Sequence, residues 1–155
     1  MEISKRDDLK NFILEASRAT YASGDMSLQE KQSNGSTTIR YENDAYKYHD
    51  NYFGGEPYGG REVIFHGDKP LWMMVYYGFV HSDIDNKVVY PFLIEALSHS
   101  TPDMPYRGPV SFERSNWKYE NKLVGDVERF SGTEKIFKDG VCIYEASYLG
   151  GLVDQ

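Results

Sequence analysis

The stretch PFLIEA, residues 91–96, repeats almost letter for letter the stretch NFILEA, residues 11–16. In both stretches the apolar residues recur at the spacing of one face of a helix. A chain of 155 residues in which one helical phrase occurs twice suggests an internal repeat, because repeated units preserve the order of their elements. The segments that follow each phrase support this interpretation.

The first half of the chain predicts one helix followed by four strands. Apolar residues from Leu9 to Ala16 recur at helical spacing and predict a helix over 5–21. Residues 23–35 are polar and contain two glycines, which predicts an exposed loop. β-Branched and aromatic residues separated by turn signals then predict strands over 36–43, 45–53, 60–67 and 71–80.

The second half predicts the same order of elements. A helix is expected over 90–99, with Pro91 in its first turn, where the missing N–H would be unpaired in any case. The pair Asp139-Gly140 between two alternating runs is a strong hairpin signal. The predicted strands are 109–114, 116–124, 129–138 and 141–150.

The two halves align in one order with few gaps. The matched segments include YKY (46–48) with WKY (117–119), and EVIF (62–65) with EKIF (134–137). We therefore predict a single domain, 1–155, made of two α-β-β-β-β repeats at about 5–80 and 86–150.

The element order of each repeat resembles the cystatin-like plan, in which one helix packs on a curled antiparallel sheet. The predicted fold class is accordingly α+β, with helices packed on curled antiparallel sheet. A helix covers one face of a sheet only, so the two repeats would cover each other's apolar surfaces, through one continuous sheet or through two sheets in contact. Because the strand over 71–80 is apolar on both faces, we expect it to be central and buried twice.

Composition and charge restrict the classes of partner. Hydrophobic residues make up 40% of the chain and aromatic residues 15%, which is typical of a globular domain. The net charge of −7 gains nothing from phosphate counterion release, so no direct nucleic-acid contact is expected. No apolar run reaches the roughly 20 residues that span a bilayer, the N-terminus has no apolar signal region, and Cys142 has no partner for an intrachain disulfide. We expect a soluble, cytoplasmic protein without a membrane partner.

Several phrases recur together in a recognisable order. They are FILEASRATYA (12–22), YHDNYFGG (48–55), GGREVIF (59–65), PLWMMVYYG (70–78), PFLIEAL (91–97), MPYRGP (104–109), FSGTEKIF (130–137) and YEASYLGG (144–151). Together they resemble an uncharacterised bacterial domain family, a domain of unknown function found alone or C-terminal to helix-turn-helix segments in XRE-type transcriptional regulators. The resemblance implies a shared fold and a regulatory association, and it assigns no reaction. DNA binding is not carried over, because the first predicted helix begins almost at Met1.

The histidines and the cysteine do not form a metal-binding motif. None of the four histidines shows HxH or HExxH spacing. The segment HSDID (81–85) offers nitrogen and oxygen ligands, but it lacks the glycine and the distal glutamate of a calcium loop and is expected to be a solvated connection. Cys142 lies in an apolar strand and is expected to be an inert thiol. We predict no metal and no cofactor.

Two glutamates occupy equivalent positions in the two repeats. Glu62 and Glu134 each follow a glycine by two residues. Paired carboxyl groups can perform acid–base chemistry if one of them is desolvated. Duplication alone also explains their recurrence, and outward-facing glutamates are common in strands. No nucleophile elbow, phosphate loop or dinucleotide fingerprint is present, so no catalytic residue is predicted and a non-enzymatic function is favoured.

The segment PYRGP (105–109) presents Arg107 between Tyr106 and a Gly-Pro pair. Proline restricts the backbone, so the guanidinium is expected to point in a fixed direction. It could clamp an anionic ligand, or pair with a carboxylate such as Glu95 or Asp103. The aromatic residues of the fourth strands could likewise line a groove or form a core.

The leading hypothesis is a non-enzymatic small-molecule-binding or sensing domain, related to effector modules of transcriptional regulators. The predicted ligand-binding residues, in a groove between the repeats, are Trp72, Tyr76, Tyr144, Tyr148, Tyr106 and Arg107. One alternative is a protein-interaction module that forms a homodimer through a sheet edge or an exposed aromatic patch. Another is a small hydrolase or isomerase that uses a buried Glu62 or Glu134.

Overall fold

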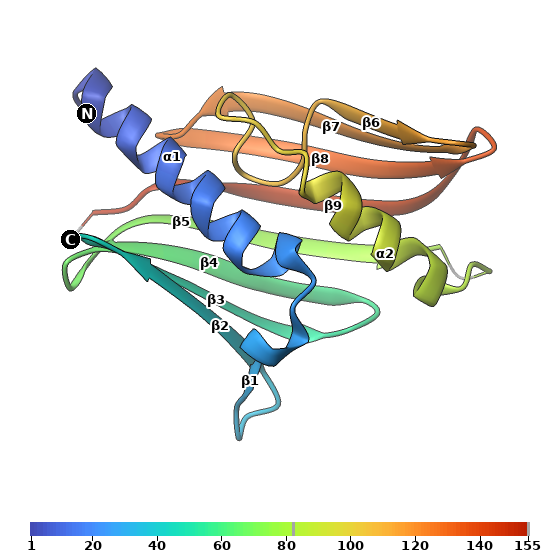
Figure 1. Cartoon of the computed structure of the whole chain (residues 1–155), viewed down its shortest axis with the longest axis horizontal. Helices are drawn as coiled ribbons and strands as arrows, with labels where there is room; N and C mark the ends of the chain where they lie inside the picture. The colour runs from blue at the N-terminus through green and yellow to red at the C-terminus, as the bar shows by residue number, and fades with distance from the viewer. Residues whose placement is uncertain (82, 155) are drawn as a thin grey trace.

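The computed structural model describes residues 1–81 and 83–154 (Figure 1). The helices are α1 (Ile3–Ala19) and α2 (Asn86–Leu97), with two short 3₁₀ helices, η1 (Tyr21–Ser23) and η2 (Met26–Leu28). The strands are β1 (Glu30–Lys31), β2 (Thr37–Asn43), β3 (Tyr46–Gly54), β4 (Tyr58–His66), β5 (Lys69–Val80), β6 (Ser111–Arg114), β7 (Trp117–Asp126), β8 (Arg129–Lys138) and β9 (Val141–Leu152).

All nine strands of the described residues belong to one antiparallel sheet, in the order β1-β2-β3-β4-β5-β9-β8-β7-β6. Strands adjacent in sequence pair with each other on either side of the centre. At the centre, β5 pairs with β9 from Trp72 opposite Leu152 to Val80 opposite Tyr144. This central pair joins two sets of hairpins into a continuous sheet.

The predicted α+β fold class is wrong, because the protein has a mainly-β fold. Half of the chain lies in strands and less than a quarter in helices. The hairpins merge through β5 and β9 into one broad sheet instead of forming separate helix-on-sheet units of the cystatin-like kind. The two helices add a partial cover to this sheet.

The order of elements is the same on both sides of the centre. Helix α1 precedes β2–β5 and helix α2 precedes β6–β9, and the strand order reads symmetrically outward from the β5–β9 pair. Tyr76 lies opposite Tyr148 at the middle of this pair. The division into repeats at about 5–80 and 86–150 stays a prediction.

Both helices lie on the same face of the sheet, which we call the inner face (Figure 1). Helix α1 buries an apolar stripe that includes Leu9, Phe12 and Ile13 in a cluster with side chains of β3, β4 and β5. Helix α2 buries Val89 and Phe92 in a second cluster with side chains of β7, β8 and β9. This burial follows from the helical spacing of the apolar residues.

Trp72 is the largest side chain buried within the first cluster, with 0% exposure. Its ring stacks on Phe130 and Tyr106, with centroid distances of 5.5 and 6.2 Å. Its indole N–H donates to the carbonyl oxygen of Val127 at 3.1 Å, so the polar tip is satisfied. Trp72 therefore belongs to the core.

The opposite side of the sheet, which we call the open face, carries exposed apolar side chains at its centre. Val75, Tyr77 and Phe79 of β5 are 37%, 56% and 38% exposed. The expectation that β5 is buried on both faces is therefore wrong, although the strand is central. Within the described residues both helices contribute to clusters on the inner face, so nothing equivalent covers the open face. Homodimerisation through an exposed aromatic patch stays a prediction.

Helix α2 begins at Asn86, four residues before the predicted start. The Asp85 carboxylate accepts a hydrogen bond from the backbone N–H of Lys87 at 2.9 Å and caps the helix. Pro91 consequently lies inside the helix and not in its first turn. The segment 23–35, predicted to be a loop, contains η2 and β1.

Gly132 tests how tightly the centre of the sheet is packed. A Cβ atom at this position would lie 2.0 Å from Cζ of Tyr148, whose side chain is buried and hydrogen-bonded to Asn121. We expect Gly132→Ala to lower the free energy of unfolding in urea by about 1–3 kcal/mol, because overpacking displaces neighbours. Gly55→Ala is the control, since no atom lies within 4 Å of its Cβ. Equal losses in the two variants would contradict this packing.

Candidate functional site

A pocket of about 410 Å³ lies on the inner face, between η1, η2, β1, α2 and the strands of the first half of the sheet. Its size falls within the range of small-molecule sites. The pocket is lined by five tyrosines and by four charged side chains, of which Asp50 and Arg107 are buried and Asp25 and Lys31 are exposed. The tyrosines are Tyr21, Tyr52, Tyr58, Tyr76 and Tyr90.

Arg107 is engaged in a buried ion pair. Its Nε and Nη2 atoms donate to Oε1 of Glu134 at 3.1 and 2.6 Å. The side chains are 5% and 0% exposed, so water does not screen the pair. The partner is neither of the expected carboxylates: Glu95 instead pairs with Arg114 at 2.5 Å, and Asp103 has no ion pair among the described residues.

Two tyrosine hydroxyls also donate hydrogen bonds to the Glu134 carboxylate. Tyr144 donates to Oε1 at 2.9 Å and Tyr119 donates to Oε2 at 2.5 Å. The hydroxyl of Tyr58 accepts from Arg107 Nη2 at 3.2 Å and shares a hydrogen bond with Tyr144. A buried carboxylate is stable only when its lone pairs are satisfied in this way. Burial and the charge of Glu134 raise the pKa values of Tyr119 and Tyr144, so both remain protonated donors.

Two further acids lie side by side beneath the pocket. Asp50 of β3 and Glu62 of β4 are cross-strand partners, 3% and 1% exposed. Tyr76 donates to Oδ1 of Asp50 at 2.5 Å. Oε1 of Glu62 and the hydroxyl of Tyr48 are both buried without a hydrogen-bond partner among the described residues.

Burial changes the protonation of this pair. It raises the pKa of Asp50 to about 6, although the hydrogen bond from Tyr76 and the charges of Arg107 and Arg61 oppose the shift. Burial, together with the charge of Asp50, raises the pKa of Glu62 well above its usual value. Glu62 is therefore the weaker acid of the two, and ionisation of the pair falls first on Asp50.

The equivalent strand positions in the second half differ in charge. Asn121 lies opposite Glu134 as Asp50 lies opposite Glu62, and Tyr148 donates to Asn121 Oδ1 at 2.6 Å. Glu134 forms an ion pair with Arg107. In contrast, no described Lys, Arg or His nitrogen lies within 4.0 Å of a carboxylate oxygen of Asp50 or Glu62. The pocket therefore contains a carboxylate without a direct counter-ion.

Arg107 connects the two polar clusters. Its guanidinium carbon lies 5.6 Å from the ring centre of Tyr21 and 5.5 Å from that of Tyr76, within cation–π range of both. Tyr76 in turn binds Asp50. The wall of the pocket is thus one polar network held from η1, from β5 and from the loop before β6.

The structure separates the predicted ligand-binding residues into two groups. Tyr76 and Arg107 line the pocket. The remaining four are buried in the two apolar clusters and do not line it: Trp72, Tyr106, Tyr144 and Tyr148. Glu62 and Glu134, whose burial the sequence left open, are 1% and 0% exposed.

Asp50 is a buried pocket residue that the sequence reasoning missed. A signal for it was present, because in β3 it alternates with Tyr48 and Tyr52, which face the core. An acid at an inward position of a strand is uncommon and indicates a specific role.

The segment 81–85, considered as a calcium loop, includes residue 82, which lies outside the described residues. His81 makes its contact elsewhere, through Nε2 to Oε2 of Glu145 at 3.1 Å, and Asp85 caps α2. These contacts separate the two side chains from a shared loop site.

The geometry is therefore that of a mainly-β domain with a buried polar network beneath a small pocket. A family model described as Domain of unknown function (DUF5680) matches residues 50–153, and the chain belongs to this family. No curated protein and no solved structure matches the chain. In the described part of the chain, no helix has the length and apolarity needed to cross a membrane. The association with transcriptional regulators and the cytoplasmic location stay predictions.

The Arg107–Glu134 pair should dominate local stability. We expect Arg107→Met to lower the free energy of unfolding by about 3–5 kcal/mol, because it leaves a buried carboxylate without its cation. Lys47→Met, which breaks the exposed 2.8 Å pair with Asp68, should leave the urea midpoint nearly unchanged. Adding Glu134→Gln to Arg107→Met should recover part of the loss. A small effect of Arg107→Met would contradict the burial of the pair.

The raised pKa of Asp50 predicts a stability that falls as pH rises. The folded state holds the Asp50 proton up to about pH 6, whereas the unfolded state releases it near pH 3.8. The contribution of this proton to the free energy of unfolding is therefore complete below about pH 3.8 and is lost as the pH rises to about 6. The loss is on the order of 3 kcal/mol. Urea unfolding from about pH 4 to about pH 7 should show a shallower decline for Asp50→Asn than for the native chain. Asp68→Asn, an exposed control, should keep the native slope, and equal slopes in all three proteins would contradict the shift.

Proposed function

We propose that this protein is a non-enzymatic small-molecule-binding domain, that the pocket on the inner face is its binding site, and that its ligand carries a positive charge. The observation that carries the proposal is the Asp50 carboxylate, which lines the pocket and has no direct counter-ion among the described residues.

The charges around the pocket favour a cationic ligand over an anionic one. Arg107, which the sequence suggested as an anion clamp, donates through Nε and Nη2 to Glu134 and is compensated by it. Lys31 at the rim donates to Thr37 at 2.9 Å. Asp25 and Lys31 are exposed at the rim, whereas Asp50 is a buried carboxylate without an ion pair among the described residues, and a buried charge gains most from an opposite partner.

The aromatic wall fits the same ligand class. Faces of tyrosine rings attract cations, and two rings of this pocket already hold a guanidinium at cation–π distance. Tyr90 adds a hydroxyl that donates to Glu56. A compact ammonium or guanidinium group would find a carboxylate at the base of the pocket and aromatic rings around it, which is the usual composition of sites for organic cations.

The sensing role is the finer part of the proposal. It rests on the resemblance to modules that accompany helix-turn-helix segments in regulators, and on a pocket bordered by the segment η1–η2. A ligand that contacts this segment and α2 together would stabilise their packing, because binding to the folded state raises stability by mass action.

A charge-sorted thermal-shift screen tests the proposal. We expect cationic metabolites to raise the melting temperature, and isothermal titration to show binding that strengthens from about pH 5 to about pH 7 as Asp50 ionises. Asp50→Asn keeps an acceptor for Tyr76 but removes the charge, so it should weaken binding at least tenfold, or about 1.4 kcal/mol.

Asp68→Asn is the matched control and should bind as the native chain does, since Asp68 lies on an exposed turn outside the pocket. Ligands that are all anionic would overturn the charge assignment. The absence of any stabilising ligand in all three charge classes would overturn the binding function itself.

A further inference from the structure

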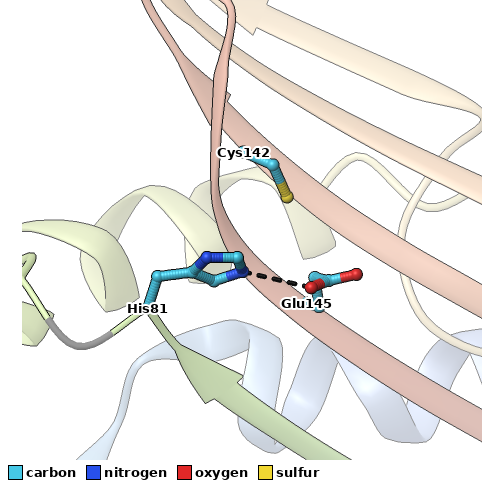
Figure 2. A group of neighbouring side chains, drawn as sticks. All are labelled: His81, Cys142 and Glu145. Carbon is cyan, nitrogen blue, oxygen red and sulfur yellow. Dashed lines mark hydrogen bonds and ion pairs between the residues drawn. The ribbon is translucent and has the colours of Figure 1, made fainter.

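We propose that His81, Cys142 and Glu145 form a zinc site on the open face of the sheet, apart from the pocket on the inner face. Figure 2 shows the three side chains converging from the end of β5 and the start of β9. Their ligand atoms all lie within 4.8 Å of one another. Nε2 of His81 is 3.1 Å from Oε2 of Glu145.

A bulge in β9 brings the cysteine to this cluster. In a regular strand, Cys142 and Glu145 would point to opposite faces, because their separation is odd. The register with β8 shifts between Ile136, opposite Tyr144, and Phe137, opposite Cys142, so Ile143 is the extra residue. Bulges redirect side chains in this way and are frequent beside functional sites.

The corresponding place in the first half of the sheet serves as an internal comparison. There the register of β5 with β4 shifts in the same manner and leaves Leu71 as the extra residue. The backbone N–H of Val153 donates to Leu71 as that of His81 donates to Ile143. The positions that match His81, Cys142 and Glu145 are then occupied by the non-ligating side chains Val153, Pro70 and Met73. The bulge in β9 thus lies beside three possible metal ligands, whereas the equivalent bulge in β5 lies beside none.

The three donor types select the metal. Imidazole nitrogen, thiolate sulfur and carboxylate oxygen are the ligands of zinc, and three protein ligands leave a fourth tetrahedral position for water or a substrate atom. Zinc–ligand bonds of about 2.0–2.3 Å place the donor atoms roughly 3.5 Å apart, which small side-chain rotations reach from this arrangement. Zinc binds the thiolate, so the thiol proton passes to solvent as the metal enters.

Neighbouring side chains hold two of the ligands in position. Lys135 binds Oε1 of Glu145 at 3.2 Å and leaves Oε2 directed toward His81. The imidazole of His81 stacks on Phe79 with an interplanar angle of 17°. Such outer contacts orient metal ligands and raise affinity, because less freedom is lost on binding.

Titration of the metal-free chain with Co²⁺, under reducing conditions, tests the site. We expect one ion per chain and a thiolate-to-cobalt charge-transfer absorption, which Zn²⁺ then abolishes by displacement. The absorption is assignable because Cys142 is the single cysteine. Zn²⁺ should also protect this thiol from alkylation.

His81→Gln and Cys142→Ser should each weaken Zn²⁺ binding by at least roughly tenfold, since loss of an outer contact alone costs that much. His66→Gln, on β4 and outside the cluster, should bind as the native chain does. Glu145→Gln supplies a third variant if Cys142→Ser does not fold, as judged by circular dichroism. Cobalt binding without a thiolate band, or undiminished affinity in His81→Gln, would overturn the site.

Discussion

The pairing of β5 with β9 is the constraint on which the rest of the structure depends. It joins two sets of hairpins into one sheet and places Tyr76 opposite Tyr148 at the centre. Each of these tyrosines binds an inward polar residue of its own half, Asp50 or Asn121. The same pairing brings His81 beside the start of β9. The pocket on the inner face and the group of His81, Cys142 and Glu145 on the open face thus depend on the same backbone hydrogen bonds between β5 and β9.

The buried charged residues differ between the two halves of the sheet, although the order of the strands is the same on both sides of the centre. Three buried acids share one buried arginine, and that arginine is held by Glu134. Low dielectric makes an unmatched charge costly, so burial raises the pKa of Asp50 to about 6 and the pKa of Glu62 well above its usual value. Ionisation of the buried Asp50 lowers the stability of the folded state, and perturbed pKa values of this kind are common at functional sites.

Much of the fold could be predicted from local patterns. Alternating apolar residues and turn signals located the hairpins of β2–β5 and β6–β9, and helical spacing located both helices, because these signals act over a few residues. The pairing of β5 with β9 has no local signal, so the sequence left open whether the repeats form one continuous sheet or two sheets in contact. The fold class was wrong because strands make up half of the chain and the helices less than a quarter. Strict alternation would place Cys142 and Glu145 on opposite faces, because a bulge is not encoded by a simple period.

The two ends of the sheet have a consequence for the behaviour of the protein in a crowded solution. Strand β1 has two residues, Glu30 and Lys31, and β6 has four and ends at Arg114. Short, charged outer strands offer few free backbone groups to an incoming chain and repel its approach. A broad antiparallel sheet would otherwise be a template for fibrous growth, and in the described part of the chain this sheet ends on both sides in such a strand.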